Sequence, residues 1–188
     1  MDLIGIENEA EFFPSGTLSD VLKDELQDIT ARWAGLEKGA HPVERLVRVA
    51  TPTIEALRQV RNVSDRTRRA ELVRDAHHAV LAALGYVWKR ETAYTALDGA
   101  PVIPLVSRVA DTSGRDALWV IETPIPAADD EATDPLGTTF TADQFALDGG
   151  EMGLVDRSVE SILAEGVFEL SDGPRHVLIL GLSQLVLI

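Results

Sequence analysis

The sequence predicts a mixed α/β fold in which helices come first and strands follow. Three observations support this fold class. Apolar residues recur every three or four positions up to Gly85, short apolar runs between turn residues follow it, and a further helical period appears over residues 156–166. A chain of 188 residues is long enough for one compact domain. We expect an N-terminal helical segment over 1–63 that packs on an α/β core over 64–188.

Two helices are predicted in the N-terminal segment. Residues 15–33 carry a single apolar stripe, and Ser15 or Thr17 is suited to cap the first turn. A second helix starts at Pro42, where the missing amide hydrogen costs nothing. We expect this helix to break or bend at Pro52, because proline removes a hydrogen bond from the helix interior.

A third helix is predicted with clear boundaries. Ser64 or Asp65 caps its start, and Gly85 ends it. Its buried stripe is expected at Val73, Ala76, Val80 and Leu84. The adjacent His77 and His78 point about 100° apart on a helix, so we expect one buried and one exposed histidine rather than a metal site.

After Gly85 the pattern becomes that of strands. Residues 86–94, 101–110 and 117–122 predict an antiparallel meander with tight turns between its strands. Residues 124–138 are rich in proline and acids, which predicts an exposed loop. The last elements are a helix over 156–166, capped by Asp156 with Val159, Ile162 and Leu163 inward and Gly166 as its end, and two strands, 176–181 and 184–188.

The composition indicates a reducing compartment and an acidic surface. The chain has no cysteine, which excludes disulfides and thiolate metal sites, so we expect a cytoplasmic protein. Its apolar runs are shorter than the roughly 20 residues of a membrane helix, and we expect no membrane partner. The net charge is −14, and only four Lys or Arg residues follow residue 94. The second half therefore repels polyanions.

Positive charge concentrates between residues 58 and 74. The stretch contains six arginines that are candidate DNA contacts: Arg58, Arg61, Arg66, Arg68, Arg69 and Arg74. The alternative is a solvated helix face in which these arginines pair with neighbouring acids.

From residue 65 the predicted order is helix, three strands, helix, strand, which resembles the core topology of the PD-(D/E)xK nuclease fold. Such a nuclease holds Mg²⁺ with two carboxylates and uses a lysine to position the attacking water. The candidate residues, if the site is active, are Glu71, Glu122 and Lys89, with Glu122 as the candidate metal ligand.

The nuclease signature itself is incomplete in this chain. The second strand, Ile103-Pro104-Leu105-Val106, has no acid, and Pro124 follows Glu122-Thr123 where a lysine is required. Asp111 lies beyond the second strand, in a turn. Loss of a metal carboxylate and of the cation removes most of the charge stabilisation of the reaction. We expect a catalytically degenerate domain in which no residue is assigned as catalytic or metal-binding. We expect no cofactor of its own, and Mg²⁺ only if the nuclease is active.

Several sequence blocks resemble the N-terminal region of large single-chain bacterial restriction-modification and phage-defence DNA methyltransferases, the type IIG-like group. These blocks are "ENEAEFFPSGTLSDVLKDEL", "HAVLAALGY", "LWVIETP" with the acidic segment after it, and the C-terminal "ILAEGVFELSDGPRHVLILGLSQLVLI". The resemblance implies a downstream adenine methyltransferase domain that uses S-adenosylmethionine. It also implies DNA and defence-system subunits as partners of the full protein. The chain ends inside an apolar strand, so we expect it to be part of a longer protein.

Two other functions stay open. One is an active metal-dependent endonuclease in which Lys89 replaces the missing lysine. The other is a free-standing acidic module that binds a basic protein in a salt-sensitive way.

Overall fold

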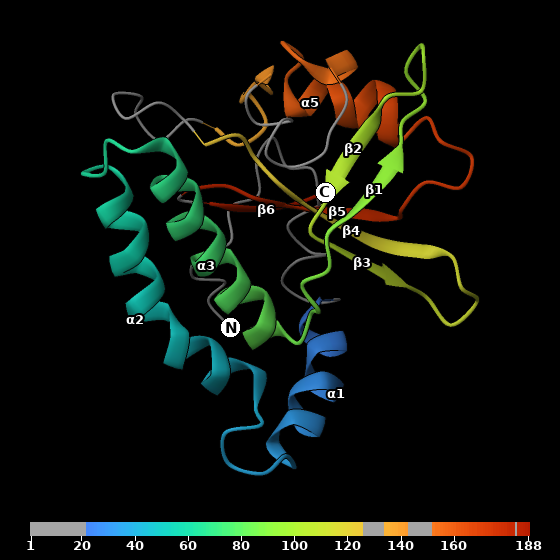
Figure 1. Cartoon of the computed structure of the whole chain (residues 1–188). Coiled ribbons are helices and arrows are strands. Elements are labelled where there is room, and N and C mark those ends of the chain that lie inside the picture. Colours follow the sequence, from blue (N-terminus) through green and yellow to red (C-terminus); the bar gives the residue numbers. More distant parts are fainter. Residues whose placement is uncertain (1–21, 126–133, 143–151, 183) are drawn as a thin grey trace. The chain divides into compact units, whose positions relative to one another are not determined.

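The computed structural model describes residues 22–125, 134–142, 152–182 and 184–188 (Figure 1). It is a mixed α/β protein with helices and two β-sheets. Two compact units make up the chain, Met1–Arg48 and Val49–Ile188. The boundary between them lies inside a helix. Within the described residues, none of the helices is long and apolar enough to cross a membrane.

The N-terminal helices are α1 (Leu22–Ala34) and α2 (Pro42–Val60). The expected caps Ser15 and Thr17 lie outside the described residues. Helix α2 begins at Pro42, as predicted, and it continues through Pro52, so of the break or bend expected there the break does not occur. A proline lacks the amide hydrogen for one helical bond, yet the turns on both sides keep their own bonds.

Helix α3 (Arg66–Leu84) has the predicted ends. The Asp65 side chain accepts the amide hydrogen of Arg68 at 2.7 Å, and Gly85 adopts the left-handed conformation that ends the helix. The predicted stripe is only partly buried. Val73 and Ala76 are buried, but Val80 and Leu84 stay half-exposed, and the fully buried position is Leu81.

The expected three-strand meander is divided between two sheets. Strands β1 (Glu91–Tyr94) and β2 (Val102–Leu105) form an antiparallel pair, while β3 (Ser107–Ala110) and β4 (Asp116–Glu122) belong to the second sheet. The run 101–110 therefore makes two strands that meet at Val106. The amide of Val106 donates to the Val120 carbonyl at 2.9 Å, and its carbonyl accepts from Lys89. The chain changes hydrogen-bonding partner at this residue.

The second sheet has four strands in the order β3-β4-β5-β6. Strand β5 (His176–Leu180) runs parallel to β4, with Glu122 opposite Leu180, and β6 (Leu185–Leu187) is antiparallel to β5. A parallel pair needs a long crossover. The described part of this crossover contains the short helices η3 (Met152–Leu154), α5 (Val159–Ser161) and η4 (Ile162–Val167), the last of which is a π-helix.

The crossover helix differs from its prediction at both ends. Val159, Ile162 and Leu163 point inward, as predicted. The expected cap Asp156 is wrong, because Ser158 accepts the amide hydrogen of Ser161 and Asp156 has a positive φ of 65°. The helix also continues past Gly166 to Val167.

The central strands β4 and β5 are packed on both faces of the sheet, and their side chains alternate between these faces. On one face, Val120 and Leu180 pack against Leu81 of α3. On the other face, Trp119, Ile121, Val177 and Ile179 pack with η3, α5, η4 and the β1-β2 pair. Strand β4 is therefore central, and Leu118, Val120 and Glu122 lie on its face toward α3.

The N-terminal cap of α3 supports a direct stability test. Replacing Asp65 by alanine removes the acceptor of the Arg68 amide hydrogen and is expected to lower the free energy of unfolding by about 1 kcal/mol. Urea denaturation checks the value. Ser64→Ala is the matched control, and an equal loss in both variants would contradict the assignment of Asp65 as the cap.

Candidate functional site

The Glu122 carboxylate is held at the end of β4 by a histidine from α3. Atom Oε1 of Glu122 lies 2.7 Å from Nδ1 of His77. The side chain of His77 is 4% exposed and that of Glu122 13% exposed. A carboxylate this enclosed needs a hydrogen-bond or charge partner, since an unpaired buried charge is costly. His77 supplies that partner.

The other ring nitrogen of His77 contacts the turn between β5 and β6. Atom Nε2 lies 3.1 Å from the carbonyl oxygen of Gly181, in a buried position. Gly181 is itself fixed by the turn, because its amide donates to the Gln184 carbonyl at 2.9 Å. We call His77, Glu122 and the Gly181 carbonyl the His77 junction.

Local periodicity explains why these groups meet. Val73, His77 and Leu81 recur every fourth residue, so they form one stripe of α3, and all three are buried. Along β4, Val120 and Glu122 alternate with residues whose side chains lie on the opposite face of the sheet. Val120 and Glu122 therefore face α3. The parallel register then sets Leu180 beside Glu122, so Gly181 follows at the same end of the sheet.

The lysine candidate forms its ion pair away from the junction. The side chain of Lys89 is 74% exposed, and Nζ pairs with the carboxylate of Glu91. This hydrogen bond from Lys89, with the charges of Lys89 and Arg108, lowers the pKa of Glu91 below its ordinary value despite some desolvation. Glu91, rather than Glu122, is therefore the observed partner of Lys89.

The second carboxylate candidate also has another partner. Glu71 lies on the exposed face of α3, where it pairs with Arg68 at 2.9 Å. It lies six residues before His77, which is about 120° around the helix. The contacts of the described residues thus give Glu71, Lys89 and Glu122 three different partners and do not bring them together.

The residues after Glu122 extend the sheet and are themselves buried. Thr123 donates its amide hydrogen to the Leu180 carbonyl at 3.0 Å, and both Thr123 and Pro124 are buried. A lysine at position 124 would need to place its ammonium group in this interior. The missing lysine of the nuclease signature is thus replaced by a residue that contributes to packing.

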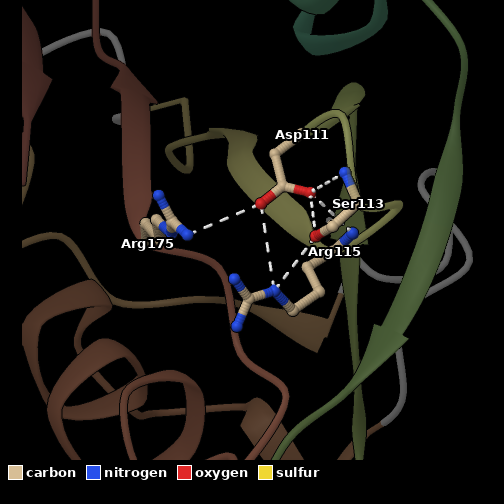
Figure 2. Close-up of polar contacts among 4 residues, drawn as sticks. All are labelled: Asp111, Ser113, Arg115 and Arg175. Carbon is tan, nitrogen blue, oxygen red and sulfur yellow. Dashed lines mark hydrogen bonds and ion pairs between the residues drawn. The ribbon is translucent and has the colours of Figure 1, made fainter.

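Asp111 organises the hairpin between β3 and β4, as Figure 2 shows. One carboxylate oxygen accepts hydrogen bonds from the Ser113 amide at 2.8 Å, the Ser113 hydroxyl at 2.5 Å and the Arg115 amide at 3.1 Å. The other oxygen lies 3.5 Å from the guanidinium of Arg175. Asp111 is at the opposite end of β4 from Glu122, about 20 Å away at 3.3 Å per strand residue. The two carboxylates therefore cannot share one metal ion.

These contacts stabilise the charged form of Asp111. The hydroxyl of Ser113 is the largest cause, and the amides of Arg115 and Ser113 and the Arg115 charge add to it, so the pKa of Asp111 is lowered although desolvation opposes the shift. A carboxylate with a lowered pKa stabilises the fold above its unfolded-state pKa. That stabilisation is lost as the pH falls through the folded-state pKa.

The arginine candidates differ in exposure. Arg58, Arg61, Arg66 and Arg68 are exposed, Arg74 is half-buried, and Arg66 donates to the Thr141 hydroxyl at 3.2 Å. Arg69 is buried at 8% exposure, and its Nε has no hydrogen-bond partner. Arg69 is therefore not on the surface, in contrast to the four exposed arginines.

Sequence reasoning correctly expected one buried and one exposed histidine, since His77 is buried and His78 exposed. It did not identify His77 as the partner of Glu122. One signal was available: an acid at the end of a buried strand needs a donor, and a histidine lay on the buried stripe of the preceding helix. Over the described residues there is no group of three or more His, Asp or Glu side chains placed to hold a metal ion.

Removing the Ser113 hydroxyl tests the turn. Ser113→Ala is expected to raise the pKa of Asp111 toward its ordinary value, because the largest stabilising hydrogen bond is lost. NMR titration of the Asp111 carboxyl carbon measures the shift. Thr112→Ala, one residue away, serves as the control, and an unchanged Asp111 titration in Ser113→Ala would contradict the hydrogen-bond assignment.

No family model matches this chain, and no curated protein or solved structure matches it. The geometry of the His77 junction and of the residues around it is therefore the basis for a functional proposal.

Proposed function

We propose that this chain is a catalytically inactive, nuclease-like domain that acts as a scaffold or as a contact to DNA or partner proteins. One observation carries the proposal: the carboxylate of Glu122 lies 2.7 Å from His77 instead of facing an open ligand position. A metal-dependent nuclease needs this carboxylate free to bind the cation. Here a side chain of the protein takes that place.

The order of elements supports the nuclease-like part of the proposal. Helix α3 comes first, followed by the strands β1 to β4, the crossover helices and β5 parallel to β4. The candidate acid stands at the exit of β4, next to its parallel neighbour. Many α/β domains share such an order, so the site, rather than the order, decides the function.

The positions of the other candidate residues support the inactive part. Lys89 pairs with Glu91, Glu71 pairs with Arg68, and Pro124 is buried. None of these residues offers a second carboxylate or a cation to a substrate bound at Glu122. Positioned charge of this kind supplies most of the rate enhancement in such sites.

A contact role for DNA or a partner has support on the helical surface. Four of the candidate arginines, Arg58, Arg61, Arg66 and Arg68, are exposed between the end of α2 and the first turn of α3. Guanidinium groups at such positions contact phosphates without reading sequence. We infer that any DNA affinity of the domain is non-specific and weakens with salt.

We further propose that the domain belongs to a type IIG-like restriction-modification or phage-defence adenine methyltransferase. The support is the resemblance of its sequence blocks to the N-terminal region of such proteins. S-adenosylmethionine would then bind in a different domain of the full protein, and the downstream domain would be the immediate partner of this one.

A cleavage and stability assay tests the inactive site. We expect no Mg²⁺- or Mn²⁺-dependent cutting of plasmid DNA, and no rise in Tm when either ion is added, because a ligand that binds the folded state would raise it. Glu122→Ala and the exposed control Glu71→Ala should leave the cutting assay unchanged. Cutting that disappears in Glu122→Ala, Glu71→Ala and Lys89→Ala would instead establish an active nuclease with a relocated lysine.

The parent protein is tested by the mass of the native product in its own cells. Immunoblotting with an antibody against this domain is expected to detect a product several times larger, and mass spectrometry should find peptides that continue past Ile188. A product of about 20.4 kDa would contradict the methyltransferase assignment and favour a free-standing acidic module.

A further inference from the structure

We propose that the His77 junction is a buried ion pair in which His77 carries the imidazolium form and donates from both ring nitrogens. It ties three elements together: α3 through the ring, β4 through Glu122 and the β5-β6 turn through the Gly181 carbonyl. The inference concerns the charge of one side chain and does not depend on the proposed nuclease-like function.

A count of donors and acceptors leads to this assignment. A neutral imidazole has one N–H donor and one bare nitrogen acceptor. The carbonyl oxygen of Gly181 can only accept, so Nε2 of His77 must carry a hydrogen to bond with it. The remaining nitrogen, Nδ1, faces the carboxylate oxygen of Glu122 at 2.7 Å, and an ionised carboxylate also only accepts. Both nitrogens therefore carry hydrogens.

A protonated Glu122 beside a neutral His77 ring would also give each hydrogen bond one donor and one acceptor. The relative basicity of the two groups decides against it, because an imidazole is a stronger base than a carboxylate. A proton shared by the two groups goes to the imidazole first. The distance of 2.7 Å also falls within the range of about 2.7–2.9 Å for a charge-assisted N–H···O bond.

The described contacts of the ring are those to Glu122 and to the Gly181 carbonyl. From β4, Glu122 faces the ring. From the β5-β6 turn, the described residues after Gly181 carry no titratable side chain, and His176 lies at the other end of β5. On α3 itself, Asp75 and His78 are exposed, and Arg74 is half-buried and has interactions of its own. The buried Arg69 lies on the same stripe, about two turns before His77.

The effect of the His77–Glu122 pair on the stability of the fold depends on its burial. A buried ion pair with further hydrogen bonds adds little net stability, but the loss of one member leaves the other charged and unpaired. Removing His77 would strand a carboxylate at the end of the central strand, and removing Glu122 would strand an imidazolium in the core. The two single losses should therefore add up to more than the loss measured when both residues are replaced.

NMR of the wild-type protein tests the charge directly. In a sample with ¹⁵N-labelled histidine at pH 7, we expect both ring nitrogens of His77 to show an attached hydrogen protected from exchange. The exposed His78 is the internal reference, since its ring hydrogens exchange with water. A bare Nδ1 or Nε2 on His77 would overturn the proposal, whether the ring is neutral beside a carboxylate or neutral beside a protonated Glu122.

Stability measurements give a second, independent readout. His77→Gln should lower the urea midpoint clearly, whereas His78→Gln, a neighbour on the exposed face, should leave it unchanged. In a double-mutant cycle of His77→Gln and Glu122→Gln, the combined loss should be smaller than the sum of the single losses. Additive losses, or equal losses for His77 and His78, would overturn the ion pair. Neither result bears on DNA cleavage, so failure here is distinguishable from failure of the proposed function.

Discussion

The parallel pairing of β4 with β5 is the constraint on which the second unit depends. It requires a crossover, which the chain supplies with α5, η4 and the segments around them. It also sets Leu180 beside Glu122, so the β5-β6 turn and the end of β4 lie together. The side chains of β4 alternate between two faces of the sheet, and each face is covered by a hydrophobic cluster. The position of Glu122 in the His77 junction is a consequence of this register.

A polar group at such a position must be satisfied inside the protein. The cluster of Leu81, Val106, Val120 and Leu180 fills the space between α3 and the sheet, and Glu122 stands at the edge of the same layer. Here the partner is an imidazole with a second bond to a main-chain carbonyl. Both ring nitrogens of His77 already have a partner in the protein. A ligand could bind to this ring only after one of these contacts is broken.

The elements with local signals were predictable from the sequence. Asp65 and Gly85 bounded α3 correctly because capping involves only neighbouring residues. The split of 101–110 at Val106 was missed because a strand's partner is chosen by distant residues, Val120 and Lys89 in this case. The Asp156 cap was missed for a related reason: the backbone there turns to a positive φ, and Ser158 takes the capping role. The continuity of α2 through Pro52 was also missed, since a single lost hydrogen bond does not end a helix that is held on both sides.

The sequence by itself determined the mixed α/β class, the ends of α3, the inward positions of the crossover helix and the absence of the nuclease lysine and second-strand acid. These features depend on composition, spacing and local hydrogen bonds. Only the tertiary structure decided that Glu122 meets His77 and Gly181, and that Asp111 lies far from Glu122. Those pairings join residues that are distant in the sequence, and their geometry is set by sheet register and helix packing, which no local pattern encodes.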